Sequence, residues 1–414
     1  MDELMVGLWH CQGMARASDH RTNPASAPAR QGSIRDANLA LLYRLIVDAP
    51  APLSRAALAA TTGMTRATAS ALADALLAAN LVQEVSPPPA TGAGRPAAGL
   101  VPATTGPVGL GLEVNVDYLA ACVVDLAGQV RDSLTLHGDQ RGRRPAEILG
   151  DLAGLARKVS PDLTVAGAAV AVPGLVEAPH GRIRRAPNLA WQDVEIAHTL
   201  RELLPGTPFD LAVGNEADYA ALAEAHTADD GDGGSRAARP RAAADRGAAP
   251  LTDFLYVSGE IGVGAGIVLG GEVFGGARGW AGEIGHVTVA PGGGLCRCGA
   301  LGCLETVAGL EALQRTGPEA AAPALGRAVA TAVNLLDMPA VVLGGVYARP
   351  EFAADLLPGV ERALAEHVVS ARWAPVTVRV SRLGETAAAV GAAVAVVRRI
   401  HAHPAGWLEA LTRP

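Results

Sequence analysis

Hydrophobic positions along the chain follow two different periods, which divide it into two kinds of structure. Between residues 32 and 103, apolar residues recur at spacings of three and four, and this period predicts short helices. They are expected over about 35–48, over about 55–61, and from Thr65 to about Ala79. Two short apolar runs follow, LVQEV and the segment around Leu100, and they predict a pair of strands. This part of the chain is therefore predicted to be a small α+β unit.

From about residue 106 to about residue 400, apolar strand-like runs alternate with helical stretches. Strands that alternate with helices are typical of an α/β fold, so we predict that fold class for most of the chain. The predicted strands are VGLGLEV, LAACVVDL, VAGAAVAV, LAVG, FLYVSGE, GAGIVLGG, AVVLGG and VTVRVS.

Two segments show no hydrophobic period. Residues 1–31 are rich in Ala, Ser, Pro, Arg and Gly, and residues 227–250 read TADDGDGGSRAARPRAAADRGAAP. Segments with so few apolar residues bury little surface, so the first is predicted to be a disordered leader and the second a flexible insertion. The expected organisation is a leader at 1–31, a small unit at 32–103 and a larger domain at 104–414.

Composition and charge exclude several classes of protein. A chain of 414 residues suggests two or three domains, and the formal net charge of -7 means that any contact with DNA must come from a local surface. No apolar run approaches the length of a membrane span. The N-terminus also lacks the basic start and long apolar core of a secretory signal. These features predict a cytoplasmic protein with no membrane partner.

Three of the five cysteines lie close to a histidine in the segment GEIGHVTVAPGGGLCRCGALGCLE. His286, Cys296, Cys298 and Cys303 follow the spacing H-x9-C-x-C-x4-C. Three thiolates and one imidazole form a complete tetrahedral ligand set for Zn²⁺ and leave no open position, so the predicted metal is structural. A chance group of buried thiols or a disulfide pair is the alternative interpretation, and neither gives the histidine a role.

The small α+β unit has the features of a winged helix-turn-helix. Gly63 separates two short helices, and the second helix of such a motif places its N-terminal residues in the major groove of DNA. The turn TGAGRP would be the wing, and Arg95 within it could reach phosphate or the minor groove. A helical bundle used for dimerisation is the alternative. The candidate DNA contacts on the second helix are Thr65, Arg66, Thr68 and Ser70.

With both parts considered, the chain resembles the ROK family of repressors and sugar kinases over residues 35 to 400. The resemblance rests on AGEIGH followed by CRCGALGCLE, on VPGLVEAPHGRIRRAPNLAW at 172–191, and on VVLGG at 341–345. It implies an actin-like, ribonuclease H-like fold of two lobes with a sugar in the cleft between them. The helical unit and GRP are similar to the DNA-binding part of the family's regulators.

The resemblance also implies which residues bind the sugar. Asn188, Glu283 and His286 correspond to family residues that hydrogen-bond a hexose, and Gly174 lies where the family backbone approaches it. Glu305 is a further candidate. Asn215 and Glu216, which belong to the segment that carries the catalytic base in the kinases, are also candidates for binding the sugar.

Three departures argue against kinase activity. The family phosphate loop has two glycines where this chain has Asn115 and Val116, and Asp117 replaces its threonine. Ile261 stands where a second loop would bond phosphate, and Glu216 replaces the catalytic aspartate with a side chain one methylene longer. A displacement of about 1 Å at a catalytic group can lower a rate on the order of a hundredfold. No catalytic residue is therefore assigned.

These observations predict a sugar-responsive transcriptional regulator, a repressor that binds operator DNA and a sugar or sugar-phosphate effector. A homodimer or homotetramer is expected. An ATP-dependent sugar kinase with an accessory N-terminal domain is the first alternative. A zinc-stabilised interaction protein with neither ligand nor operator is the second.

Overall fold

The computed structural model of the protein describes residues 31–86, 98–160, 162–205, 211–226 and 251–412. The predicted leader, the predicted wing turn with Arg95 and the predicted insertion at 227–250 lie outside these residues, except that Gln31 begins the first helix. None of the helices in the described part of the chain is long and apolar enough to cross a membrane.

The N-terminal unit contains the three predicted helices. They are α1 (Gln31–Asp48), α2 (Arg55–Thr62) and α3 (Arg66–Ala78), and α1 begins four residues earlier than predicted. Thr65 caps α3 by accepting a hydrogen bond from the Thr68 N–H at 3.1 Å. Three short strands accompany the helices in the order β1-β3-β2: β1 (Leu53–Ser54), β2 (Val82–Val85) and β3 (Gly99–Pro102).

The first lobe of the α/β part, called lobe 1 here, contains a five-stranded sheet of order β11-β7-β4-β5-β6. The strands are β4 (Val108–Val114), β5 (Tyr118–Val124), β6 (Val130–His137), β7 (Val165–Val172) and β11 (Ala212–Asn215). Helices α4 (Pro145–Val159) and α5 (Ile196–Leu203) belong to the same lobe. A second, three-stranded sheet consists of β8 (Leu175–Glu177), β9 (Arg182–Ala186) and β10 (Trp191–Glu195).

The second lobe, lobe 2, has a five-stranded sheet of order β14-β13-β12-β15-β16. The strands are β12 (Phe254–Gly259), β13 (Val263–Leu269), β14 (Glu272–Val273), β15 (Ala340–Gly345) and β16 (Thr377–Val380). In each lobe an antiparallel meander is followed by two parallel strands, so both sheets have the same plan. The predicted fold of two related lobes is confirmed. The helices of lobe 2 are α7 (Glu305–Ala308), α8 (Leu310–Thr316), α9 (Pro318–Leu336) and α10 (Pro350–His367).

All of the predicted α/β strands are present, but the prediction missed β6, β8, β9, β10 and β14. Strand β6 exposes nearly every residue, and β14 is two residues long. Edge strands and short strands need no apolar run, because they bury little surface and depend on hydrogen bonds to a neighbouring strand. The hydrophobic pattern therefore could not predict these strands.

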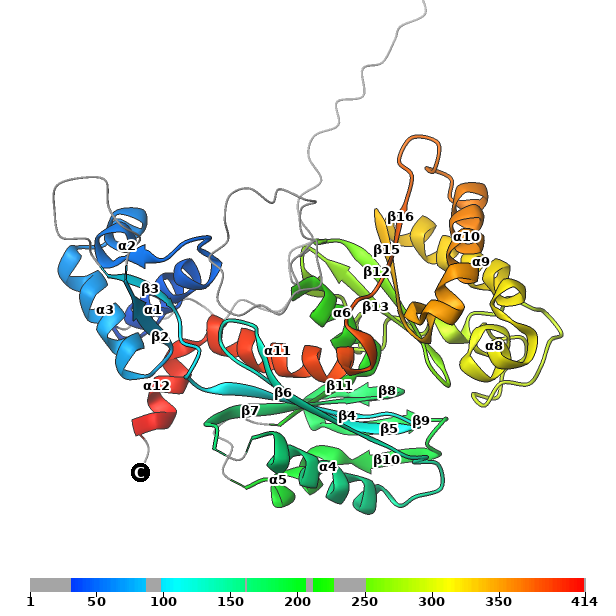
Figure 1. Cartoon of the computed structure of the whole chain (residues 1–414), viewed down its shortest axis with the longest axis horizontal. Helices are drawn as coiled ribbons and strands as arrows, with labels where there is room; N and C mark the ends of the chain where they lie inside the picture. The colour runs from blue at the N-terminus through cyan, green and yellow to red at the C-terminus, as the bar shows by residue number, and fades with distance from the viewer. Residues whose placement is uncertain (1–30, 87–97, 161, 206–210, 227–250, 413–414) are drawn as a thin grey trace, which may run out of the picture.

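Two helices cross the region between the sheets (Figure 1). They are α6 (Glu216–His226) and α11 (Ala387–Ala402), and both are rich in alanine. Small residues let backbones approach closely: a Cβ on Gly111 of β4 would lie 1.8 Å from the carbonyl oxygen of Ala389 in α11. Close packing of this kind explains why so many alanines occur in the helices between the lobes.

The N-terminal unit and the C-terminal helices share one hydrophobic core, which includes residues of α1, α3, α11 and α12 (Pro404–Thr412). The Trp407 indole N–H donates to the carbonyl of Ala79 at 3.2 Å. The ring of Tyr43 in α1 lies 5.3 Å from that of His401 in an edge-on contact. The unit predicted to bind DNA is thus packed directly against the α/β part, beside α12 (Figure 1).

Candidate functional site: a metal cluster and an interlobe cleft

The candidate metal ligands lie on a loop, residues 282–305, that we call the metal loop. Its backbone packs against β13: the Ala265 N–H donates to the Gly282 carbonyl at 3.0 Å. Gly282 has φ +98°, and a Cβ there would lie 1.9 Å from the Ala265 carbonyl oxygen, so only glycine fits. Gly302 is similarly constrained against Ala290, at φ +71°. These glycines allow the loop to fold back so that its cysteines meet.

The four candidate ligands come together as predicted. One ligand atom from each of His286, Cys296, Cys298 and Cys303 lies within 4.8 Å of all the others. Tetrahedral Zn²⁺ with bonds of about 2.3 Å to sulfur separates neighbouring sulfurs by about 3.8 Å. The Cys298 and Cys303 sulfurs are 3.7 Å apart, and Cys296 Sγ is 3.8 Å from His286 Nδ1. The donor set and its spacing therefore fit a metal ion, and the sulfurs are too far apart for a disulfide.

The other ring nitrogen of His286 faces a carboxylate. With Nδ1 directed at the sulfur cluster, Nε2 lies 3.7 Å from Glu283 Oε2. Burial raises the pKa of Glu283, and the neighbouring His286 opposes that rise. A metal held through Nδ1 would fix the tautomer and leave an Nε2–H donor beside this carboxylate, a pair suited to a hydroxyl ligand.

Asn188 and Glu305 converge on the same point of the cleft. A Cβ built on Gly262 would lie 2.7 Å from Glu305 Oε2 and 2.8 Å from Asn188 Nδ2, so the two side chains meet over this glycine. Asn188 belongs to the loop between β9 and β10, whereas Glu305 begins α7 in lobe 2. Polar groups from both lobes therefore meet at this point.

Gly174 and Asn215 are joined by a hydrogen bond. Gly174 has φ +94°, and a Cβ there would lie 2.2 Å from the Arg185 carbonyl oxygen. Asn215 donates through Nδ2 to the Gly174 carbonyl at 3.0 Å, and its Oδ1 accepts from the Ala217 N–H at 2.8 Å. Asn215 thus caps α6 and holds the Gly174 turn, which leaves it one amide N–H for a ligand.

Arg297 of the metal loop ties the two lobes together. Its guanidinium donates to Asn188 Oδ1 at 3.1 Å and to both carboxylate oxygens of Glu311 at 2.9 and 3.1 Å. A second bond between lobes runs from the Arg185 guanidinium to the Cys298 carbonyl at 3.2 Å. Sequence reasoning assigned no role to Arg297, because nothing in its neighbours along the chain indicates a partner more than 100 residues away.

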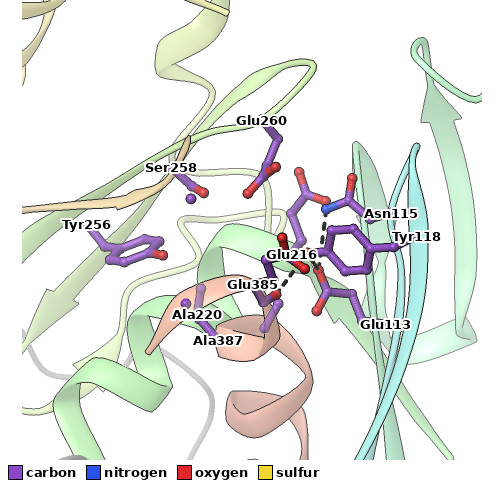
Figure 2. Close-up of a pocket in the computed structure, with 13 residues that line it drawn as sticks. Glu113, Asn115, Tyr118, Glu216, Ala220, Tyr256, Ser258, Glu260, Glu385 and Ala387 are labelled. Atoms are coloured by element: carbon purple, nitrogen blue, oxygen red, sulfur yellow. Dashed lines mark hydrogen bonds between the residues drawn. The ribbon is translucent and has the colours of Figure 1, made fainter. Parts of the chain in front are cut away.

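A second group of carboxylates lies deeper between the lobes and lines a small cavity of about 20 Å³, room for roughly one water molecule, that we call the acidic cavity. Figure 2 shows Glu113 from β4, Glu216 from α6 and Glu260, which follows β12, around this space. Burial is the main cause that raises the pKa of Glu113 to about 7 and that of Glu216 to about 8. Burial also raises the pKa of Glu260 well above its usual range.

The acidic carboxylates differ in their partners. Glu113 accepts hydrogen bonds from the Tyr118 hydroxyl at 2.7 Å, from the Ala389 N–H at 3.1 Å and from Asn115 at 3.4 Å. By contrast, neither Glu216 nor Glu260 has a hydrogen-bond donor among the described residues. The sequence analysis assigned no role to Glu260; a carboxylate directly after a buried strand was the available signal.

The candidate DNA contacts lie on the N-terminal unit. Thr65, Arg66 and Thr68 are exposed at the start of α3, and Ser70 is half-buried. The Thr65 and Thr68 hydroxyls are 2.8 Å apart and partly satisfy each other. Arg55 binds Asp74 at 2.8 Å and also pairs with Glu84, which ties α2 to α3 and to β2. Arg55 therefore helps to fix the position of α3 relative to α2 and β2.

The family model described as the ROK family matches residues 109–234, 242–324 and 318–399 of the chain. A candidate xylose repressor from Caldicellulosiruptor sp. (strain Rt8B.4) is 28% identical over 416 residues, covering 90% of this chain and 98% of the relative. The DNA-binding transcriptional dual regulator NagC of Escherichia coli (strain K12) is 28% identical over 288 residues, 68% of this chain and 64% of its own.

A glucokinase from Halalkalibacterium halodurans is 36% identical over 154 residues, which are 37% of this chain and 40% of the kinase. Among solved structures, a ROK family transcriptional regulator described as a homologue of the E. coli MLC protein superposes with a TM-score of 0.69. The superposition covers 91% of this chain and 99% of the regulator's chain at 24% identity. It therefore supports the fold, including that of the N-terminal unit.

Proposed function

Because this chain belongs to the ROK family, we propose that it is a sugar-responsive transcriptional repressor. In this proposal the N-terminal winged helix-turn-helix binds operator DNA, and the cleft between the lobes binds a carbohydrate. The names of two relatives, one a xylose repressor and one the regulator NagC, support this class of function.

The observation that carries the proposal is the contrast between the two sides of the cleft. Asn188 and Glu305 meet over Gly262, and Glu283 faces His286 in the metal loop. Carboxylates and amides of this kind can pair with several sugar hydroxyls. The acidic cavity lies where the family resemblance would place the phosphates of a nucleotide, beside Asn115 and Glu113. These carboxyl groups offer a triphosphate no positive charge and repel it where they are ionised, so the cleft can hold a sugar without transferring phosphate to it.

The metal is proposed to be a structural zinc ion held by His286, Cys296, Cys298 and Cys303. Zinc with four protein ligands has no open position for chemistry, so its contribution is to hold the metal loop. The chain's own residues do the binding: His286 presents Nε2 toward Glu283, and Arg297 holds Asn188 in place. Cytoplasmic thiols stay reduced, and the DNA lies in the same compartment, which is consistent with this assignment.

On the DNA side, α3 is proposed to enter the major groove with Arg66 and Thr68 toward the bases, while Thr65 and Ser70 contact the backbone. Arg95 would contact phosphate or the minor groove from the wing. A homodimer or homotetramer would place two such helices on half-sites about one helical turn apart, or a multiple of that.

Helix α11 offers a physical connection between the cleft and the DNA-binding unit. The Ala389 N–H at its start donates to Glu113 Oε2 at 3.1 Å, and the His401 ring near its end lies against Tyr43 of α1. A ligand that changes how the lobes close around Glu113 would therefore move one end of a rigid helix whose other end packs on the N-terminal unit. Such a ligand shifts DNA affinity only to the extent that it binds the two arrangements differently.

The test is binding of the full chain to DNA fragments selected from its own genome, followed by fluorescence anisotropy with and without a panel of pentoses and hexoses. We expect a selected fragment to bind, at least one sugar to release it, and Arg66→Ala to weaken binding about tenfold. Arg372→Ala, an arginine on lobe 2, is the matched control. No selective binding to any fragment would overturn the proposal.

A sugar kinase with an accessory domain is the second candidate, because the glucokinase relative is 36% identical over the matched segment. Glu216 would be its base, although that residue faces other carboxylates rather than a phosphate-binding loop. ATP-dependent phosphorylation of the same sugars at an ordinary kinase turnover of about 1–100 s⁻¹ would favour this candidate over the repressor.

A further inference from the structure

We infer that strand β6 is the surface at which two copies of this chain pair edge to edge, in an antiparallel register centred on Thr135. The five-stranded sheets of lobe 1 in the two copies would then form one continuous sheet. The inference rests on the proposed function, because a repressor that binds two half-sites needs two copies of the chain, and it adds the surface that joins them.

Strand β6 is an edge strand without the usual protection against pairing. It is the last strand in the order β11-β7-β4-β5-β6, and its eight residues are all exposed except the half-buried Thr135 (Figure 1). Natural edge strands are commonly kept from pairing by lysine, proline, a short length or a covering element. Residues 130–137 contain no lysine and no proline, and no described strand pairs with their outer side. A long edge of this kind is a site for pairing with another strand.

The hydrogen-bond pattern shows which backbone groups of β6 face outward. The Gly138 N–H donates to the Asp117 carbonyl at 2.8 Å, so the even-numbered residues direct their N–H and C=O groups toward β5. The N–H and C=O groups of Ser133, Thr135 and His137 therefore point away from the sheet. A row of such groups on an extended strand is matched by a second extended strand, which defines the chemistry of the partner.

The side chains of β6 are complementary to themselves in one register. Antiparallel pairing centred on Thr135 places Leu134 of each copy opposite Leu136 of the other. These leucines are 36% and 45% exposed, so pairing would cover apolar surface that the single chain leaves in solvent. Centring the pairing one or two residues earlier would instead place the Asp132 carboxylate opposite a leucine. The register about Thr135 is therefore the one that the side chains favour.

The longer segments of this chain outside the described residues match the edge less well than a second β6. A strand paired with β6 needs apolar side chains opposite its leucines and a backbone without proline. Residues 87–97 are rich in proline and glycine, and residues 227–250 contain no valine, leucine or isoleucine. Residues 1–30 have a single apolar run, LMVGLW, which Gly7 interrupts. A second copy of β6 supplies both the leucines and the outward-facing backbone groups.

The start of β6 contacts the segment that joins the N-terminal unit to lobe 1. The Arg131 guanidinium donates to the Thr104 carbonyl at 3.2 Å and lies 3.4 Å from Asp125. Because Arg131 comes four residues before Thr135, the two copies of Arg131 would lie about eight positions apart along the paired strands, roughly 27 Å. Half-sites one helical turn apart are separated by about 34 Å. Pairing through β6 would therefore set the two junctions at a separation of the same order as the half-sites.

The experiment is disulfide cross-linking of the full chain with one cysteine introduced into β6. Residues that face each other in a hydrogen-bonded pair have Cα atoms about 5.5 Å apart, within the range of a disulfide. We expect Thr135→Cys to form covalent dimers at least tenfold faster than Ser133→Cys, whose two copies would lie roughly 14 Å apart. The original chain controls for its own cysteines. Absence of Thr135→Cys dimers, or equal rates in the two variants, would overturn the inference.

Leu136→Lys provides the second arm, because a lysine on an edge strand opposes pairing. We expect the dissociation constant of the dimer in sedimentation equilibrium to rise at least tenfold. Leu269→Lys, at a leucine of lobe 2 that is 40% exposed, is the matched control and should dimerise like the original chain. Circular dichroism of each variant excludes misfolding as the cause of a loss. An unchanged dissociation constant in Leu136→Lys would overturn the inference.

Binding to DNA separates this inference from the proposed function. We expect Leu136→Lys to weaken binding to a selected fragment with two half-sites at least tenfold, and to change sugar affinity less than threefold. Failure of the original chain to bind any fragment, with Thr135→Cys dimers still forming, would remove the proposed repressor and support the pairing surface. Selective DNA binding without Thr135→Cys dimers would support the repressor and overturn the pairing surface.

Discussion

The two sides of the interlobe cleft use glutamates in opposite ways. On the side of the metal loop, Glu283 and Glu305 lie beside ring and amide nitrogens, within reach of His286 and Asn188. In the acidic cavity, Glu216 and Glu260 face mainly other carboxylates and lack hydrogen-bond donors among the described residues. The first arrangement is complete enough to bind a neutral polar ligand. The second carries uncompensated charge that must be neutralised by protons or by a ligand.

The largest expected effect comes from the metal cluster on the first side. Cys303→Ser removes a fully buried thiol, and we expect loss of one equivalent of zinc and a fall in the free energy of unfolding of roughly 3–5 kcal/mol. Metal analysis and urea denaturation measure the two quantities.

Cys122→Ser, in the core of lobe 1, is the control for changing a buried cysteine. It should keep its zinc whatever it does to stability. Full zinc content in Cys303→Ser would show that the cluster is not a metal site.

The next effect is on sugar affinity. Glu283→Gln keeps the size of the side chain but removes the charge facing His286 Nε2. A hydrogen bond to a charged group contributes about 1.5–3 kcal/mol, so sugar binding should weaken roughly 10- to 150-fold in calorimetry.

Glu351→Gln in α10 is the matched control, since that glutamate is exposed and remote from the cleft. Unchanged sugar affinity in Glu283→Gln would show that the sugar does not bind beside the metal loop. The two sides of the cleft would then not differ in the way described here.

A smaller effect concerns the pH dependence of stability without ligand. The pKa of Glu216 is about 8 in the fold and about 4.3 in an unfolded chain, so folding takes up a proton between these values. The free energy of unfolding should therefore fall as pH rises from about 4.5 to 8. Glu216→Gln lacks this term and should be more stable than the original chain at pH 8, by about 1–2 kcal/mol, and similar at pH 4.5.

Urea denaturation across this pH range measures the difference between the two chains. Parallel curves for the original chain and Glu216→Gln would mean that the pKa of Glu216 is the same in the folded and unfolded chain, so that its charge is compensated in the fold, and the acidic cavity would then resemble the other side of the cleft.

The smallest expected effect on sugar affinity comes from removing the hydrogen bonds of Arg297 between the lobes. Arg297→Ala removes the guanidinium shared by Asn188 and Glu311, both partly exposed. Exposed ion pairs contribute about 0.2–1 kcal/mol, so sugar affinity should change about two- to fivefold. Arg372→Ala is the control, and a loss above a hundredfold would place Arg297 in direct contact with the sugar.

The sequence by itself determined the elements whose signals are local. The metal loop was predicted because its four ligands lie within eighteen residues, from His286 to Cys303, and its glycines permit the turns between them. The helices of the N-terminal unit and the buried strands were predicted because an apolar period reports burial directly. Thr65 was predicted as a cap because its preference depends on the backbone of the next few residues.

Only the tertiary structure decided what depends on distant parts of the chain meeting. Glu113, Glu216 and Glu260 come from separate elements of both lobes, and their pKa values rise because packing buries them side by side. Arg297 reaches Asn188, and Trp407 reaches Ala79, across more than 100 and 300 residues respectively. The exposed strand β6 has no period of its own and is held by hydrogen bonds to β5. Burial, charge and pairing in these places are properties of the packed molecule, because each depends on what surrounds a residue in space.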